Sequence, residues 1–250
     1  MWSRQELKTR AKEVLKGSYW KAFLVSILIL FTSGGGGGGG NINLPNNSNA
    51  PGSMYGYNAA NIFDTIPLNL IAVFIAIIFF AILIGIGIRI FLGYPVEVGG
   101  RKYFIRAAEG HVSINYLSLV FKKVHYLNVV KTMFLKDLYI FLWFLLFIIP
   151  GIVKGYAYSM VPYIMAENPG MDYKRAIEIS NNMTYGHKFK MWVLDLSFIG
   201  WFLLGSLALF VGTVFVIPYV FSTKAELYLV LKKNALDNGI CLNQEFVYEG

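Results

Sequence analysis

Long apolar runs separated by polar, mostly basic segments make up most of this chain. The runs cover residues 19–33, 66–92, 138–166, 191–210 and 212–231. A helix that crosses a bilayer needs about 20 largely apolar residues, and soluble cores rarely contain such runs. The pattern therefore predicts one all-α integral membrane domain (1–250), a polytopic helical bundle of about six membrane-inserted helices plus amphipathic interfacial helices.

The run 138–166 is interrupted by Pro150 and Gly151. If it were one continuous span, the basic segment after it would face outward, against the positive-inside rule. Proline removes a backbone hydrogen bond and clashes with the preceding helical turn, so we expect a break there. The two arms then form a hairpin that either spans the membrane or is re-entrant. In the second arm, Gly151, Gly155 and Ser159 form a small-residue stripe suited to close helix packing.

The N-terminal segment, residues 1–18, is predicted to form an amphipathic helix. Ser3 and Glu6 fit a capping box, in which each side chain accepts a backbone N–H of the other residue. One helical face carries basic residues at every fourth position: Arg4, Lys8, Lys12 and Lys16. Such a face suits anionic lipid headgroups, and a solvated charged face is the alternative.

The first apolar run fits either an uncleaved span or a signal peptide. Its long polar lead-in and the lack of a small-residue cleavage site favour the span. Residues 34–64 follow, rich in glycine and asparagine and without Lys or Arg, so they predict a flexible extracytoplasmic loop. Residues 96–136 instead hold seven Lys and Arg, which predicts a cytoplasmic amphipathic segment. Lys232 and Lys233 place the C-terminal tail, residues 234–250, in the cytoplasm with the N-terminus.

Composition agrees with a membrane protein. Hydrophobic residues make up 56% of the chain and charged residues 14%, with a mean hydropathy of +0.54, whereas soluble domains carry about 25% charged residues. The net charge of +8 comes from basic residues that flank apolar runs, which favours contact with the bilayer and its anionic headgroups over nucleic acid. Cys241 is the one cysteine, which excludes an internal disulfide and a CxxC site. His111 and His125 lack a second ligand at useful spacing, so no metal or cofactor is expected.

Charged residues within the apolar segments are the candidate binding residues. Asp195 and Lys224 would lie about 6 and 10 Å from the same membrane surface at the rise of a helix. Since an unpaired charge in lipid costs several kcal/mol, we expect them to face each other or a wet cleft, with Glu167 and Glu226 nearby. Separate snorkelling of each residue to the interface is the alternative. Lys154 is expected near the outer surface, or as a ligand for an anionic substrate if it faces a cavity.

Four segments of the chain resemble one known family. They read LWFLLFIIPGIVKGYAYSMVPYIMAENPGM, RAIEIS, LSFIGW and IPYVFSTKAELY. They are similar to the bacterial integral membrane proteins grouped as domain of unknown function 975, typical of Gram-positive bacteria. That family is distantly similar to the membrane domains of some glycerophosphodiester phosphodiesterases. The resemblance extends from the N-terminal helix to about Lys233, sparing the glycine-rich loop, and implies a multi-pass protein of the bacterial cytoplasmic membrane, but no activity.

Two functions fit these features. The first is a non-enzymatic membrane scaffold or accessory subunit of an envelope or export complex, with a membrane protein partner. The alternative is a transporter or lipid-handling protein with a site at the broken hairpin, since interrupted helices often line substrate sites. An intramembrane enzyme is not expected, because the chain has no H-E-x-x-H, no G-x-S-x-G and no paired intramembrane aspartates. No catalytic residue is therefore assigned.

Overall fold

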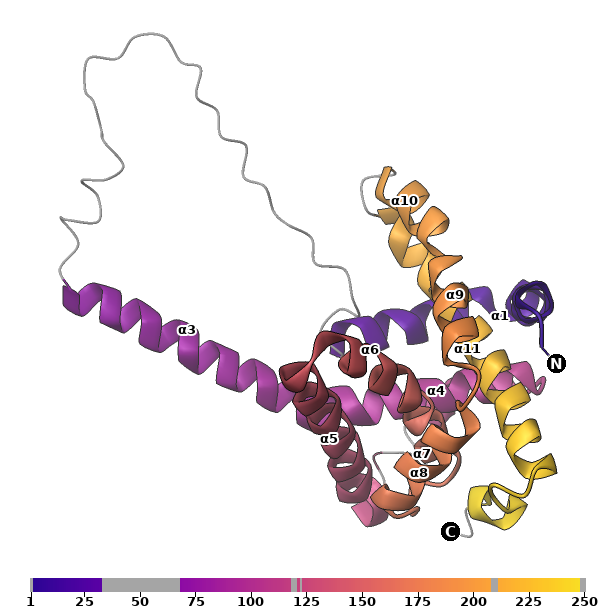
Figure 1. The fold of residues 1–250 in the computed structure, drawn as a ribbon. Helices are drawn as coiled ribbons and strands as arrows, with labels where there is room; N and C mark the ends of the chain where they lie inside the picture. Colours follow the sequence, from indigo (N-terminus) through magenta and orange to yellow (C-terminus); the bar gives the residue numbers. More distant parts are fainter. Residues whose placement is uncertain (1, 33–67, 118–120, 122, 208–210, 248–250) are drawn as a thin grey trace.

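The computed structural model describes residues 2–32, 68–117, 121, 123–207 and 211–247, and these are helical apart from short turns (Figure 1). The all-α prediction is confirmed for this part of the chain. The predicted loop at residues 34–64 lies outside the described residues. The elements are α1 (Arg4–Thr32), α3 (Leu68–Ile88), η1 (Arg89–Gly93), α4 (Tyr94–Ala108), η2 (Ile114–Leu117), α5 (Lys123–Leu146), α6 (Ile148–Ala157), α7 (Val161–Glu167), α8 (Tyr173–Met183), α9 (Lys188–Leu196), α10 (Ile199–Leu207), α11 (Val211–Asp237) and η4 (Asn243–Phe246).

Four helical stretches are long and apolar enough to cross a membrane. They are Arg4–Thr32, Asn69–Ala108, Lys188–Leu207 and Gly212–Asp237. The two arms of the predicted hairpin are not among them. The described residues therefore support four spans, fewer than the six inserted helices expected from the sequence.

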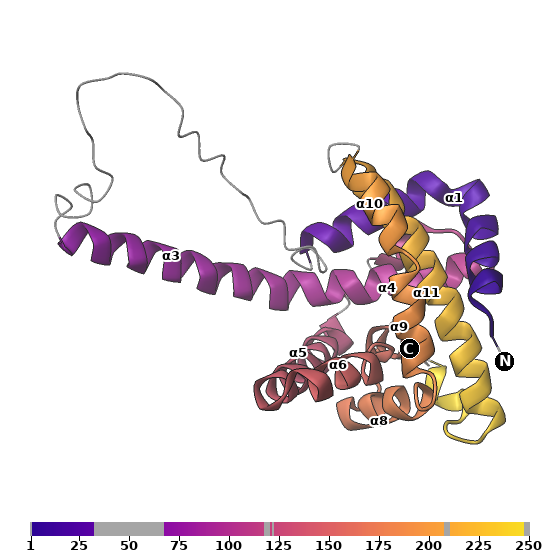
Figure 2. The ribbon, with the colours of Figure 1, turned by 45° about the horizontal axis from the view of Figure 1, so that its top comes forward.

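Helix α1 contains both the predicted amphipathic helix and the predicted first span, which the sequence suggests as separate elements. One half of the predicted capping box is present, because the Glu6 backbone N–H donates to Ser3 Oγ at 3.2 Å. The Glu6 carboxylate pairs with Arg10 at 2.6 Å. The helix bends along its length but continues without interruption to Thr32 (Figure 2). A glycine inside a helix costs about 1 kcal/mol relative to alanine, and Gly17 alone does not end this one.

The basic face of α1 is partly covered by protein. Lys8 lies 4.3 Å from the centroid of the Phe198 ring, and Lys12 lies 5.8 Å from that of Tyr219. On the other face, Leu7 and Leu15 are buried in the core. Two of the four basic side chains thus pack on aromatic rings of the bundle.

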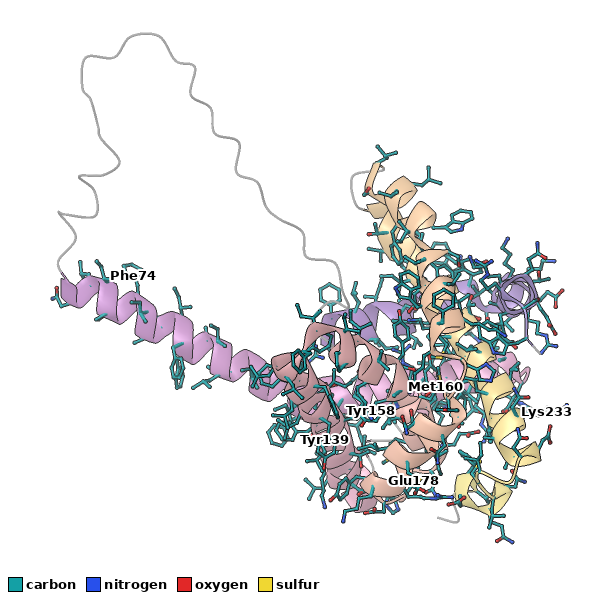
Figure 3. All side chains as sticks on the ribbon, viewed as in Figure 1. Phe74, Tyr139, Tyr158, Met160, Glu178 and Lys233 are labelled. Atoms are coloured by element: carbon teal, nitrogen blue, oxygen red, sulfur yellow. The ribbon has the colours of Figure 1, made fainter. Side chains whose placement is uncertain are left out.

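Helices α3 and α4 form one rod, joined by the π-helical turn η1. Its outer half, α3, projects away from the body, with side chains such as Phe74 exposed (Figure 3). In the most apolar window of Asn69–Ala108, none of the residues is buried. This helix therefore has the length and the apolar composition that were predicted for a span at residues 66–92.

The inner half of the rod, α4, lies at the centre of the bundle. Its Val98 and Phe104 are almost fully buried. Gly93 and Gly100 let α1 approach closely, because a Cβ at either position would collide with Thr32 or Ile29. The sequence predicts an interfacial helix in this segment. In the structure, the helix faces that carry its aromatic residues and glycines pack in the core.

The hairpin breaks at Phe147, three residues before the predicted Pro150. Phe147 has an extended backbone, with φ −155° and ψ 143°, between the end of α5 and the start of α6. Pro150 lies in the first turn of α6, where a missing N–H costs nothing. Its ring would clash with a helical carbonyl four residues earlier, that of Leu146, which is the last residue of α5. Proline is therefore the cause of the break, although the predicted position was wrong.

The small-residue stripe of the hairpin is only partly used for packing. A Cβ on Gly151 would lie 2.6 Å from the Phe144 ring and 2.9 Å from Phe144 Cα, so α5 and α6 touch there. A Cβ on Gly155 would meet nothing within 4 Å. Gly155 and Ser159 instead line a cavity.

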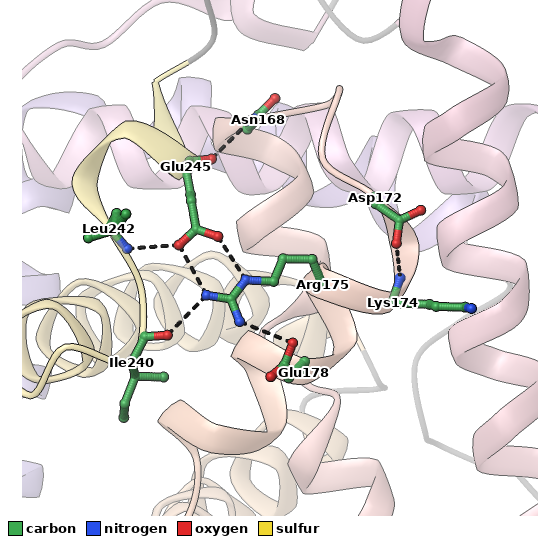
Figure 4. Close-up of polar contacts among 8 residues, drawn as sticks. All are labelled: Asn168, Asp172, Lys174, Arg175, Glu178, Ile240, Leu242 and Glu245. Atoms are coloured by element: carbon green, nitrogen blue, oxygen red, sulfur yellow. Dashed lines mark hydrogen bonds and ion pairs between the residues drawn. The ribbon is translucent and has the colours of Figure 1, made fainter.

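The C-terminal residues fold back onto α8 (Figure 4). Asp172 caps the start of helix α8 by accepting the Lys174 N–H at 3.0 Å, and Gly186 follows the helix end at φ 73°. Arg175 donates to both carboxylate oxygens of Glu245, at 2.7 and 3.2 Å, and to the Ile240 carbonyl at 3.1 Å. The Arg175 guanidinium lowers the pKa of Glu245. Residues 240–246 thus form a strap held by α8.

Candidate functional site

A cavity of about 190 Å³ lies where the broken hairpin meets the centre of the bundle. The hairpin supplies most of one wall through the turn between α6 and α7, and its Tyr158 and Met160 are labelled in Figure 3. Helices α4, α5, α9 and α11 supply the charged side chains. The lining residues are Glu97, Arg101, Lys136, Ile140, Gly155, Tyr156, Tyr158, Ser159, Met160, Pro162, Tyr163, Met191, Leu194, Asp195, Lys224 and Leu227.

The predicted pair of Asp195 and Lys224 is present in this cavity. Lys224 Nζ lies 3.1 Å from Asp195 Oδ1, and the Tyr156 hydroxyl donates to Asp195 Oδ2 at 3.1 Å. The side chains of Lys224 and Asp195 are 35% and 33% exposed, so other protein atoms cover about two thirds of each. A pair of this exposure contributes about 0.2–1 kcal/mol, which leaves Lys224 available to an anion at small cost.

Arg101 is one of two deeply buried cations of the cavity, with 12% of its side chain exposed. It pairs with Glu97 one turn earlier on α4 at 3.3 Å and donates to the Tyr163 hydroxyl at 3.3 Å. Its guanidinium also lies 4.4 Å from the centroid of the Phe221 ring. Its Nε is buried without a hydrogen-bond partner among the described residues. A guanidinium remains charged at any physiological pH, so this arginine is a fixed positive charge with an unused donor.

Lys136 completes the charged lining from α5. It is 11% exposed and pairs with Asp137 at 2.9 Å. Asp137 also accepts from the Tyr94 hydroxyl at 2.8 Å and lies 3.8 Å from Arg89. Arg89 therefore shares the Asp137 carboxylate with Lys136 and Tyr94.

The lining carries three basic residues and two acidic ones, an excess of one positive charge. Asp195 and Lys224 were candidates from the sequence, whereas Glu97, Arg101 and Lys136 were missed. Glu97 and Arg101 are four residues apart, a spacing equally typical of exposed helical pairs. Only the packing of α4 at the centre makes them part of a cavity.

Glu167 and Glu226 do not join the Asp195 pair, which corrects the expected cluster. Glu167 pairs with Lys232 at 2.6 Å and accepts a hydrogen bond from the Tyr228 hydroxyl. Lys232 follows Lys224 by two turns on the same face of α11, about 12 Å along the axis. Glu226 is only two residues from Lys224, about 200° around the helix, and it lines a separate surface groove with Arg10 and Glu13.

Lys154 lies outside the cavity lining. Its ammonium is 5.2 Å from the centroid of the Trp143 ring and 5.6 Å from that of Tyr158. It also interacts electrostatically with Lys188. The expected position of Lys154 near the outer surface stays a prediction.

Metal-binding side chains do not gather in the part of the chain that the structure describes, where no three His, Cys, Asp or Glu residues are grouped to hold an ion. Cys241 is buried there as a free thiol, and burial raises its pKa.

Residues 144–235 match the family model described as "Protein of unknown function (DUF975)". The match covers the hairpin from the end of α5 and extends into α11, so it includes Asp195 and Lys224 but not Glu97, Arg101 or Lys136. No curated protein and no solved structure shows significant similarity to the chain. The resemblance to membrane domains of glycerophosphodiester phosphodiesterases stays a prediction.

Proposed function

We propose that this chain is an integral membrane protein of the transport or lipid-handling type, which binds a small anionic group in the cavity at the broken hairpin. The observation that supports the proposal is the charge of the cavity lining, which has more basic than acidic side chains. The basic ones are Arg101, Lys136 and Lys224, and the acidic ones are Glu97 and Asp195. Catalysis and cofactors have no part in the proposal.

The arrangement of these charges suits reversible binding. Arg101 is held in place by Glu97, Tyr163 and Phe221, so little side-chain entropy is lost when a ligand arrives. Lys224 is only partly covered by protein and is paired with Asp195, so it can exchange partners. Backbone interrupted within a membrane protein is tolerated where it lines a cavity of this kind.

The binding step is tested with the purified protein in mild detergent. Inorganic phosphate, glycerol 3-phosphate and acetate are titrated, and the melting temperature is measured. A ligand at 100 times its Kd stabilises the folded protein by about 2.7 kcal/mol, so at least one of these anions should raise the melting temperature by several degrees. Lys224→Met should weaken that shift, whereas Lys174→Met, which removes an exposed lysine of α8, should not.

Absence of stabilisation by all three anions would count against the proposal, as would identical shifts for wild type and Lys224→Met. Transport is then separated from binding by flux of the stabilising anion in reconstituted vesicles. Flux that Lys224→Met abolishes and Lys174→Met leaves intact supports transport, and binding without flux supports lipid handling.

A membrane scaffold or accessory subunit is the second candidate, and helix α3 favours it. The most apolar window of the rod Asn69–Ala108 has no buried residue, which leaves its whole circumference open to another membrane helix. A photo-crosslinking residue at Phe79 of α3 should then capture one membrane protein in intact cells. The same residue at Leu203, an equally exposed position of α10, should not. Equal crosslinking at both sites, or to lipid only, would argue against a partner of α3.

We further propose a multi-pass topology in the bacterial cytoplasmic membrane, with both termini in the cytoplasm and residues 34–64 outside. Four spans, an even number, return the chain to its starting side, with α5 and α6 as a re-entrant hairpin. In a background without Cys241, a cysteine at Asn47 should react with an impermeant thiol reagent in intact cells. Reaction at Lys102 in place of Asn47 would reverse the topology.

A further inference from the structure

A second, larger groove lies between the start of α1 and helix α9, remote from the hairpin in the sequence. Its volume is about 580 Å³. Lys8 links the two helices, because its ammonium donates to the Ser197 carbonyl at 3.2 Å. The groove is lined by Trp2, Ser3, Arg4, Gln5, Lys8, Phe189, Lys190, Val193 and Ser197.

The charge of this groove is entirely positive. Arg4, Lys8 and Lys190 are its ionisable lining residues, and none of the described residues that line it is acidic. Glu6, the nearest carboxylate in sequence, pairs with Arg10 at 2.6 Å. Beside the groove, burial and the charge of Lys190 lower the pKa of His187, as expected in a region of positive potential.

Unused hydrogen-bond donors add to this charge. Helix α1 has 29 residues and starts at Arg4, and the first turn of a helix leaves N–H groups without intrahelical partners. Of these N–H groups, the Ser3 side chain accepts only that of Glu6. Trp2 lines the groove with 8% of its surface exposed, and its Nε1 is buried without a partner among the described residues. Its ring centroid lies 6.3 Å from that of His187, whose Nδ1 is also buried without a described partner.

The groove opens beside an apolar surface. Phe189, one of its lining residues, is 71% exposed. Trp192 and Leu196, three and seven residues further along α9, are also exposed, as is Leu203 of α10. Tryptophan and other aromatic residues are enriched where a membrane meets water. A free anion would use only the cationic part of this site, whereas a phospholipid would use both parts.

We infer that this groove binds the phosphate headgroup of an anionic phospholipid, with Arg4, Lys8 and Lys190 around the phosphate and the acyl chains along α9 and α10. Trp2 also lines the groove, and its Nε1 donor has no partner among the described residues. This site is distinct from the hairpin cavity, with which it shares no lining residue.

The experiment is native mass spectrometry of the detergent-purified protein, titrated with phosphatidylglycerol, phosphatidylcholine and inorganic phosphate. Phosphatidylglycerol should bind more tightly than the other two. Arg4→Gln together with Lys190→Gln should lower that affinity roughly tenfold or more, since one charge-assisted hydrogen bond contributes at least that factor. Lys16→Gln together with Lys21→Gln removes the same charge from α1 outside the groove and should leave the affinity unchanged.

Equal losses in both double variants would show a diffuse electrostatic effect and overturn the site. Equal affinity for phosphatidylglycerol and phosphatidylcholine, or binding of inorganic phosphate alone, would also overturn it. Trp2→Phe provides a test that keeps all charges. It removes a donor without a described partner, so phosphatidylglycerol affinity should drop several-fold. Because it also shortens a core side chain that is 8% exposed, the melting temperature should fall, and the affinity is measured on the folded variant. These outcomes are independent of Lys224→Met, which probes the hairpin cavity.

Discussion

Substitutions at two glycines of the hairpin should differ in their effect on stability, although the two glycines look equivalent in the sequence. Gly151 and Gly155 lie one turn apart on α6. Alanine at Gly151 would place its methyl group 2.6 Å from the Phe144 ring and 2.9 Å from Phe144 Cα. The ring can rotate, but the backbone atom can move only if α5 and α6 separate. Alanine at Gly155 meets nothing within 4 Å.

The magnitudes follow from these distances. Either change to alanine gains about 0.5–1 kcal/mol from helix propensity. Overpacking at Gly151 costs about 1–3 kcal/mol, so the two variants should differ in free energy of unfolding by about that amount. For a chain of this size, 1 kcal/mol corresponds to roughly 2–4 °C in melting temperature. Gly151→Ala should therefore melt roughly 2–12 °C below Gly155→Ala.

Thermal unfolding in mild detergent, followed by tryptophan fluorescence, measures this difference. Phe144→Leu in the Gly151→Ala background should recover part of the loss, because the ring is one of the two colliding groups. If Gly155→Ala proved as unstable as Gly151→Ala, the face of α6 that carries Gly155 would be packed against another surface. If Gly151→Ala were the more stable variant, α5 and α6 would not be in contact as described.

Three further predictions concern the charged groups. Asp195→Asn and Lys224→Met should show a coupling of about 0.2–1 kcal/mol in a double-mutant cycle of thermal stability, as expected for a partly exposed pair, and strict additivity would exclude the pair. The folded-state pKa of Glu245 is below its ordinary value of 4.5, so its stabilising effect is complete above that value and is lost as the pH falls through the lowered pKa. Limited proteolysis should therefore cut residues 240–246 faster only in acid, and Arg175→Gln should remove this pH dependence. Lys154→Met should leave anion binding unchanged, because Lys154 lies outside the cavity lining, and loss of binding in a folded variant would contradict that placement.

Features that depend on a few neighbouring residues could be predicted from the sequence. Ser3 caps the start of α1, as its position before the amphipathic segment predicts. The apolar runs identify helices long enough to span a membrane, because length and composition alone decide that property. The pairing of Asp195 with Lys224 was also predictable, since a charge within an apolar helix needs a partner at the same depth.

The composition of the cavity was decided by tertiary structure. Glu97 and Arg101 have the spacing of an ordinary surface pair, and only the close approach of α1 to Gly93 and Gly100 places their helix at the centre of the bundle. Gly151 and Gly155 have the same local sequence context, yet only Gly151 faces α5. Local sequence sets helices, caps and breaks because these depend on contacts within about four residues. Which faces of those helices meet, and so which charges share a cavity, depends on packing between residues far apart in the chain.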